Sequence, residues 1–278
     1  MRLTLLEVRR KRLLLFSVIM TALFLVLFYL LMHLLKGAYQ SDPQTVRVVA
    51  ELEGGVVGES LGLFFAYFLF AFFSIFSLIG AFSGEEETQL LAILPRPLAR
   101  AEWLLGKWVA NALVQAVYVG VVIAGIALID HGLFPLFQMT LFGLAKVWLL
   151  FTLESWVLSA FTILLSVWLP PIASGIIVSS LFFIAFIGGV VEQLYSLSTK
   201  LPIGLEYAGV ITSLILPSDG LYRRALYELN GQAQSVLQSS LGPFGTSIPP
   251  SNLFIAYAAF YGIVCLLFAI WRFQRKSF

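Results

Sequence analysis

Long apolar stretches separated by short polar segments dominate the pattern of the chain. A helix needs about 20 predominantly apolar residues to cross a hydrocarbon core of about 30 Å. Six stretches meet this requirement within a few residues, at 13–35, 61–82, 108–129, 141–169, 172–191 and 253–271. Because helices satisfy their own backbone hydrogen bonds in lipid, we predict an all-α membrane protein with six transmembrane helices in a single domain, 1–278.

Composition supports this prediction and excludes a water-soluble domain. Apolar residues make up 60% of the chain and charged residues 12%, and the mean hydropathy is +0.94. A typical soluble domain has about 45–50% apolar and about 25% charged residues. The basic segment 1–12 resembles the start of a signal peptide, but the apolar stretch after it is long and has no small-residue cleavage site, so we interpret it as an uncleaved first span.

The distribution of basic residues predicts the orientation of the spans. Lys and Arg are enriched on the cytoplasmic side of membrane proteins. With the N-terminus inside, that side holds eleven of the seventeen basic residues: Arg2, Arg9, Arg10, Lys11, Arg12, Arg96, Arg100, Lys107, Arg272, Arg275 and Lys276. Both termini are basic, so both should be cytoplasmic and the number of spans should be even. We expect a multi-pass protein of the cell's inner, cytoplasmic membrane.

The region between spans five and six, 192–252, is expected to be extracytoplasmic. Its segment 203–216 is apolar but would rise only about 21 Å as a helix, so it should be re-entrant or interfacial. Segment 221–241 has apolar residues at helical spacing and charged residues between them, which predicts an amphipathic helix lying in the membrane surface. The region is a candidate site for an extracytoplasmic partner, and a simple lid is an equal alternative.

The cytoplasmic loop 83–107, between spans two and three, carries the most informative pattern. Glu85, Glu86, Glu87 and Thr88 suit the start of a helix, where acids and hydroxyls complement the exposed N–H groups. Leucines including Leu91 follow on one face, and prolines then end the helix. Such a short amphipathic helix could receive a push from a soluble partner. On periodicity alone, an ordinary solvated loop is an alternative.

Specific motifs in this loop resemble the first cytoplasmic loop of type-two ABC exporter permeases. They are Glu85-Glu86-Glu87-Thr88, Pro97-Leu98-Ala99-Arg100 and Leu104-Leu105-Gly106-Lys107. The resemblance implies a transmembrane subunit that pairs with a second permease, identical or related, and with a dimer of separate ATPase subunits that bind ATP and Mg. It also implies a coupling helix, with Glu85, Glu86, Glu87, Thr88 and Leu91 at the ATPase contact and Pro97, Arg100, Gly106 and Lys107 shaping the return into span three.

Sequence motifs for soluble catalysis are absent. The chain has no nucleophile elbow, no HExxH, no paired cysteines and no phosphate-binding GxxxxGK[ST]. We therefore expect no enzymatic activity, no cofactor and no metal in this chain, and ATP hydrolysis on a partner. Its partners should be the lipid bilayer and other membrane or ATPase subunits, with no nucleic acid among them.

Glu154 is the most conspicuous residue outside the loop. It falls near the middle of the fourth span, where a charge costs about 2.5–3.5 kcal/mol on insertion scales. It should line a translocation path or a proton-sensitive site, or tie helices together by hydrogen bonds. The alternative function is therefore a secondary transporter or channel that uses Glu154. Lys146, about 12 Å away along the helix, should reach toward the outer headgroups rather than pair with Glu154.

Small residues predict close helix contacts in two spans. Gly54, Gly58 and Gly62 repeat every fourth position before and into span two, and Gly175 and Ser179 have the same spacing in span five. Such spacing lets two helices approach closely. Packing within the subunit and a seam between two subunits both fit the pattern.

Overall fold

The computed structural model describes residues 12–39, 44–79, 100–135, 140–197, 203–230 and 249–275. Within them lie eight α-helices and no strands: α2 (Arg12–Tyr39), α3 (Gln44–Leu78), α5 (Arg100–Leu133), α6 (Leu141–Trp168), α7 (Pro171–Leu197), α8 (Ile203–Ile215), α9 (Ser218–Asn230) and α11 (Asn252–Gln274). All except α8 and α9 are long and apolar enough to cross a membrane. The prediction of an all-α membrane protein with six candidate spans is confirmed.

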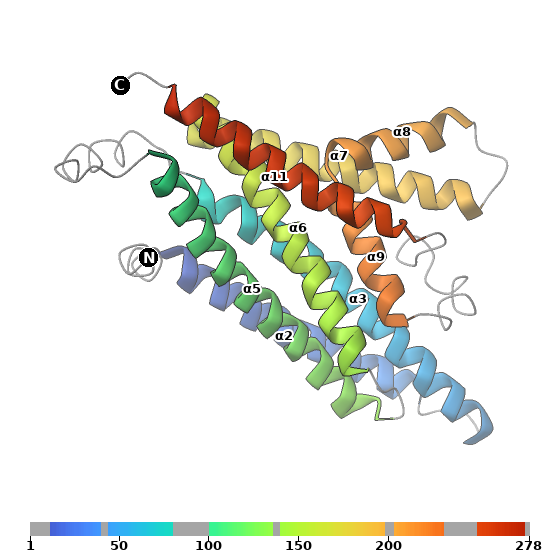
Figure 1. The fold of residues 1–278 in the computed structure, drawn as a ribbon. Helices are drawn as coiled ribbons and strands as arrows, with labels where there is room; N and C mark the ends of the chain where they lie inside the picture. Colours follow the sequence, from blue (N-terminus) through green and yellow to red (C-terminus); the bar gives the residue numbers. More distant parts are fainter. Residues whose placement is uncertain are drawn as a thin grey trace.

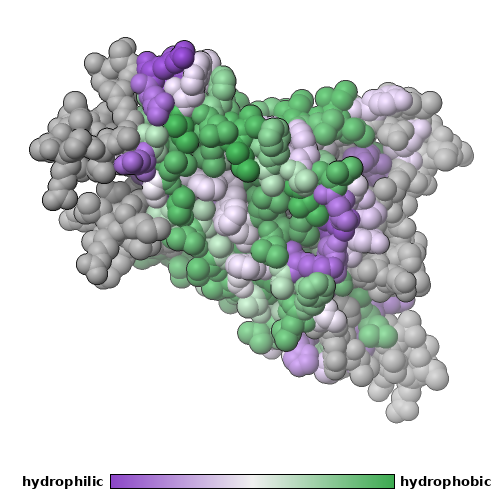
Figure 2. Space-filling view, in the orientation of Figure 1, coloured by the Kyte–Doolittle hydropathy of each residue, from purple (hydrophilic) through white to green (hydrophobic). Residues whose placement is uncertain are grey.

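The six long helices form one bundle whose ends are easily told apart. The beginning of α2, the end of α3, the beginning of α5 and the end of α11 lie at one end, which we call the termini end (Figure 1). The predicted coupling loop follows α3 and precedes α5 in the chain, and both of these described helix ends lie at the termini end. Figure 2 shows a broad hydrophobic surface along the bundle, as expected for helices that face lipid.

Helix α6 lies at the centre of this bundle. It packs against α3, α5, α7, α9 and α11. In the most apolar segment of α6, 72% of the residues are buried, whereas in the most apolar segment of α2 only 22% are buried. Side chains of α6 therefore face protein in nearly every direction, which makes this helix the one whose polar residues meet other helices rather than lipid.

Two helices extend beyond the apolar stretches that predicted them. Helix α3 begins at Gln44, well before the predicted span 61–82, and α5 begins at Arg100 rather than at 108. Close packing on α2 accompanies the extension of α3: a Cβ on Gly58 would overlap Met32, and one on Gly62 would lie 2.9 Å from the Phe28 ring. These two glycines therefore serve packing within the chain, one of the two interpretations of their spacing.

Helix boundaries at the start and end of α6 follow from local chemistry. Thr140 caps the start, because its Oγ1 accepts a hydrogen bond from the backbone N–H of Gly143 at 3.1 Å. The helix ends at Trp168 and α7 begins at Pro171, so Pro170 and Pro171 form the tight turn between them.

The short helices α8 and α9 are joined by a two-residue turn, and we call this pair the hairpin. Helix α8 occupies the predicted short apolar segment 203–216. Helix α8 packs along α7, and a Cβ on Gly209 would lie 2.6 Å from the backbone oxygen of Gly188. The turn between α8 and α9 is buried, and Ser218 there accepts a hydrogen bond from the Tyr67 hydroxyl of α3 at 3.4 Å. The amphipathic helix predicted at 221–241 was expected to lie in the membrane surface. Its described part belongs to α9, whose apolar face packs on α6, so protein rather than a membrane surface covers that face. Residues 231–241 lie outside the described residues.

Candidate functional site

A cluster of polar side chains, all buried except the partly exposed Glu192, lies where the turn between α8 and α9 meets the bundle. This central polar cluster consists of Tyr67 of α3, Glu154 of α6, Glu192 of α7, and Asp219, Tyr222 and Arg223 of α9. Tyr67 and Glu154 have no exposed surface, and Asp219 and Arg223 are 2% and 3% exposed. Four helices thus bring together charges that the bilayer would otherwise exclude.

Helical spacing explains why Glu154 faces this cluster. Phe151 lies one turn before Glu154 on the same face of α6. Its ring packs against Phe70 of α3 and Tyr222 of α9, with centroids 5.1 and 6.4 Å apart. The side chain of Glu154 therefore enters the space between α3, α6 and α9.

Arg223 is the only cation of the central polar cluster, against three carboxyl groups. Its Nη2 donates to Glu192 Oε2 at 2.8 Å, and its Nε lies 2.9 Å from Asp219 Oδ2. Burial raises the pKa of Asp219 to about 6, the charge of Arg223 opposes that rise, and Glu192 adds to it. Within the described part of the chain, neither oxygen of Glu154 has a hydrogen-bond partner. The cluster is acidic and its most deeply buried carboxyl is unpaired.

Aromatic rings enclose the polar atoms of the cluster. Tyr67 stacks on Tyr222 with ring centroids 4.8 Å apart, and Phe182 of α7 lies 4.9 Å from the Tyr67 ring. The hydroxyl of Tyr222 has no hydrogen-bond partner among the described residues. The result is a buried, aromatic environment in which an unpaired charge would be costly.

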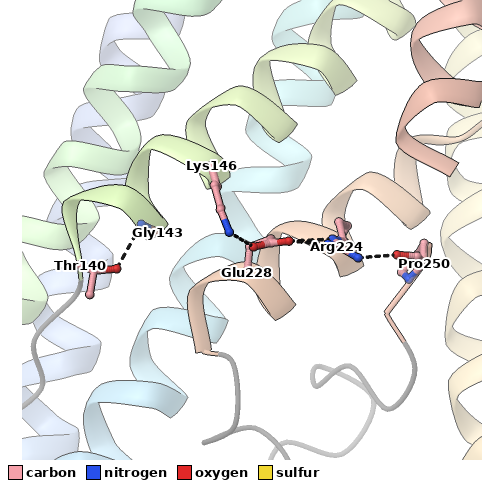
Figure 3. Close-up of polar contacts among 6 residues, drawn as sticks. All are labelled: Thr140, Gly143, Lys146, Arg224, Glu228 and Pro250. Atoms are coloured by element: carbon pink, nitrogen blue, oxygen red, sulfur yellow. Dashed lines mark hydrogen bonds and ion pairs between the residues drawn. The ribbon is translucent and has the colours of Figure 1, made fainter. Parts of the chain in front are cut away.

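A second polar group joins α6, α9 and the residues before α11 (Figure 3). Lys146 Nζ donates to Glu228 Oε2 at 2.6 Å, Arg224 Nε donates to Glu228 Oε1 at 3.0 Å, and Arg224 Nη1 donates to the Pro250 carbonyl oxygen at 2.9 Å. Lys146 thus pairs with α9 instead of reaching only toward headgroups, which corrects the sequence-based expectation. We call Lys146, Arg224 and Glu228 the polar clamp.

The polar clamp lies at the end of the bundle opposite the termini end. Figure 2 shows a hydrophilic patch over α9 and the adjoining end of α6, interrupting the hydrophobic surface. Partial burial raises the pKa of Glu228. The hydrogen bonds and charges of Lys146 and Arg224 together lower this pKa by more than burial raises it, so the net shift is downward. Glu228 is therefore held ionised between two cations.

Most of the predicted coupling residues lie outside the described residues: Glu85, Glu86, Glu87, Thr88, Leu91 and Pro97. Arg100 is the first residue of α5, and Gly106 and Lys107 lie in its second turn. A Cβ on Gly106 would meet nothing within 4 Å. Lys107 Nζ lies 4.8 Å from the Trp103 ring centroid, which gives a cation–π contact at the start of the helix.

The start of α5 packs directly on the end of α11. Trp103 stacks on Phe273, with centroids 5.9 Å and planes 16° apart. Leu104, fully buried, joins the same apolar cluster as Leu78 of α3 and Ala269 of α11. The segment that follows the predicted coupling loop is therefore fixed to the last span at the termini end.

The α5–α6 interface holds buried polar residues that sequence reasoning missed. Hydrogen bonds from Trp156 Nε1 to the Ala112 oxygen and from Trp108 Nε1 to Ser159 Oγ set its register. Buried polar atoms with no hydrogen-bond partner among the described residues occur on both helices: Asn111 and Gln115 on α5, and Thr152 and Ser155 on α6. Their helical spacing is a signal that could have been found, because 111 and 115, and 152 and 155, each share a face.

Two further acidic residues are buried elsewhere in the bundle. Glu59 of α3 and Asp130 of α5 interact electrostatically and have no hydrogen-bond partner in the described part of the chain. Neither stands out in sequence, since each lies next to a predicted span boundary. Across the described ranges, no group of three or more His, Cys, Asp or Glu could hold a metal ion.

Comparisons with known proteins identify the family without adding a function. A search of curated proteins finds no match. Residues 49–278, which include every element from most of α3 to α11, match a family model described as "Protein of unknown function (DUF2705)". On the extent of this match, the chain belongs to the DUF2705 family.

Proposed function

We propose that this chain is the membrane-spanning permease subunit of an ATP-binding-cassette transporter, acting as an exporter. It would couple ATP hydrolysis by a separate ATPase dimer, which binds ATP and Mg, to movement of a substrate across the inner membrane. It would pair with a second permease, keep both termini in the cytoplasm and carry out no catalysis itself. The observation that carries the proposal is the resemblance of loop 83–107 to the coupling loop of type-two ABC exporter permeases.

The position of this loop in the bundle agrees with the proposal. The loop joins α3 to α5 at the termini end, where α2 begins and α11 ends (Figure 1). A soluble partner on that side of the membrane would therefore meet the end of α3, the starts of α2 and α5 and the end of α11 together. Opposite charges on the partner would be attracted to the basic residues of this side.

Packing at the start of α5 offers a path for transmitting motion. Trp103 and Leu104 hold α5 against α11 and α3. A displacement of the coupling helix would move α5 and, through these contacts, the last span. Packed helices shift between discrete arrangements rather than deform continuously, which suits a transporter with two states. Glu154 would then lie on or beside the translocation path.

The first test uses the chain expressed with an ATPase encoded beside its gene. We expect stable co-purification and ATP hydrolysis, both lost in a Glu86→Arg, Leu91→Asp double variant. A matched control, Glu51→Arg with Leu52→Asp, makes the same chemical changes at the start of α3, at the opposite end, and should keep the ATPase. A folded wild-type chain that binds no ATPase would refute the proposal.

A secondary transporter or channel is the alternative, and one observation favours it. The α8–α9 hairpin places its tip beside buried charges within the bundle, as discontinuous helices do in secondary transporters. This alternative predicts substrate movement in proteoliposomes that hold the chain alone and are energised by an ion gradient. The ATPase-dependent proposal predicts no movement under those conditions.

A further inference from the structure

Glu154 is a carboxyl group buried at mid-span with nothing in the described chain to neutralise it. Its side chain has no exposed surface, and neither oxygen accepts a hydrogen bond within the described residues. A buried ionised carboxylate with neither a cation nor a hydrogen-bond donor beside it pays most of its desolvation cost without compensation. The packing around Glu154 thus favours a neutral group.

The charged neighbours of Glu154 increase this preference. Asp219 of α9 lies close enough to interact with it electrostatically, and so does Tyr67 of α3. Tyr222, also of α9, interacts with Asp219. Arg223 is engaged with two other carboxyl groups, Asp219 and Glu192 of α7. The central polar cluster contains three carboxyl groups and one guanidinium. An added positive charge would therefore be stabilised there, and a further negative charge would be repelled.

The remaining helices packed on α6 supply no cation to Glu154 in the described residues. On α5, the Tyr118 hydroxyl accepts a hydrogen bond from Thr21 of α2 at 2.9 Å. On α11, the titratable side chains Tyr261 and Cys265 contact each other. These groups therefore leave the charge balance of the central polar cluster unchanged.

We infer that Glu154 is a proton-binding site, neutral in this arrangement of the bundle, and that α9 docking against α6 is linked to its protonation. Binding adds one proton to a carboxylate oxygen and yields a carboxylic acid, with water as the source and acceptor of the proton. The inference does not depend on an ATPase partner. It holds equally for an exporter subunit and for a gradient-driven transporter.

A proton suits the geometry better than a metal ion does. A metal ion in an oxygen site needs several ligands, usually six or more for Ca²⁺ and Mg²⁺. The described residues contain no group of three or more acidic, His or Cys side chains that could hold one. A proton needs no cavity and only one carboxyl oxygen, which becomes the hydroxyl of the neutral acid.

Asp219 and Arg223 indicate how the proton would exchange with water. Arg223 bridges Asp219 to Glu192, whose side chain is 26% exposed, so the cluster has one partly accessible member on α7. The pKa of Asp219 is about 6, since burial raises it and Arg223 only partly offsets that rise. When Glu154 is ionised, its repulsion of Asp219 favours separation of α9 from α6.

Infrared difference spectroscopy of the full chain in lipid nanodiscs tests the inference. At about pH 7 we expect a carboxylic acid C=O band that disappears in Glu154→Gln and persists in the control Glu102→Gln, which alters an exposed acid on α5. Asp219→Asn should also retain the band. If the spectra of wild type and Glu154→Gln are identical in the carboxylic acid region, Glu154 is ionised and the inference is refuted.

A stability measurement provides a second, independent test. Glutamine mimics the neutral acid, so Glu154→Gln should fold. The unfolded chain loses the Glu154 proton above about pH 4.3, and the folded chain keeps it. Wild type should therefore lose stability relative to Glu154→Gln as pH is raised from about 5 to about 9. A constant difference across that range would overturn the inference, whatever the result with an ATPase.

Discussion

Lys146 of α6 and Glu228 of α9 form an ion pair with 2.6 Å between Nζ and Oε2. The pair joins α6 to α9, and Arg224, which also bonds Glu228, extends the contact to the carbonyl of Pro250. Lys146 is 40% exposed and Glu228 15% exposed at the side chain, so both charges keep some contact with solvent or headgroups. The polar clamp therefore holds α9 in place while the deeper contacts determine its packing.

Removing the polar clamp should loosen the hairpin without unfolding the bundle. Partly exposed ion pairs contribute about 0.2–1 kcal/mol, and a shared carboxylate raises the value toward the upper end. We expect Lys146→Met and Glu228→Gln each to lower the unfolding midpoint slightly. The double variant should cost less than the sum of the two. A thermal melt of all three variants in one detergent measures this coupling, and strict additivity would show that the pair contributes nothing.

The polar clamp should also weaken in acid. The net shift of the Glu228 pKa in the folded chain is downward, because Lys146 and Arg224 outweigh partial burial. A carboxyl with a lowered folded pKa contributes stability that is present above its unfolded value, about 4.3, and lost as pH falls through the folded value. Wild type should therefore lose its advantage over Glu228→Gln below about pH 4. Circular dichroism melts of the two proteins across that range provide the comparison.

Glycine at position 209 should be required for the hairpin. A Cβ there would lie 2.6 Å from the backbone oxygen of Gly188, and a backbone atom cannot rotate away. We expect Gly209→Ala to cost about 1–3 kcal/mol by overpacking α8 on α7. Gly37→Ala is the matched control, because a Cβ at Gly37 meets nothing within 4 Å. Equal unfolding midpoints for the two variants would contradict the described contact.

Trp103 should transmit the motion of the coupling helix in the proposed transporter. Its stack on Phe273 fixes α5 to α11, and such aromatic pairs contribute about 0.5–1.5 kcal/mol beyond area burial. We expect Trp103→Ala to bind the ATPase normally but to transport less substrate for each ATP hydrolysed. Leu113→Ala, at an exposed side chain further along α5, serves as control. An unchanged ratio in Trp103→Ala would exclude this route.

The six spans could be predicted because each depends only on local composition. The helix boundaries were harder to predict from the sequence. Helix α3 begins at Gln44, although residues 44–60 include Glu51, Glu53 and Glu59. Helix formers and close packing of Gly58 and Gly62 on α2 carry the helix past the apolar stretch. Hydropathy gives the extent of the membrane core and not the length of the helix that crosses it.

The candidate site was predictable only at Glu154. A carboxylate inside an apolar stretch is visible without knowing its neighbours. Asp219 and Arg223 have the spacing of an ordinary pair on an exposed helix, so nothing local indicated that both are buried. Lys146 and Glu228 lie 82 residues apart, and their contact depends on how the hairpin packs against α6. Contacts between distant segments are set by tertiary packing, which a single sequence does not display.

Site-directed cross-linking between loop 83–107 and an ATPase tests the proposed function most directly. The chain has one cysteine, Cys265, which is buried, so Cys265→Ser gives a background into which single cysteines can be placed. We predict that Leu91→Cys cross-links to the co-expressed ATPase and that Leu52→Cys, at the start of α3, does not. If a folded, membrane-inserted chain forms no cross-link from Leu91→Cys, or forms the same cross-link from Leu52→Cys, the coupling role of the loop is contradicted.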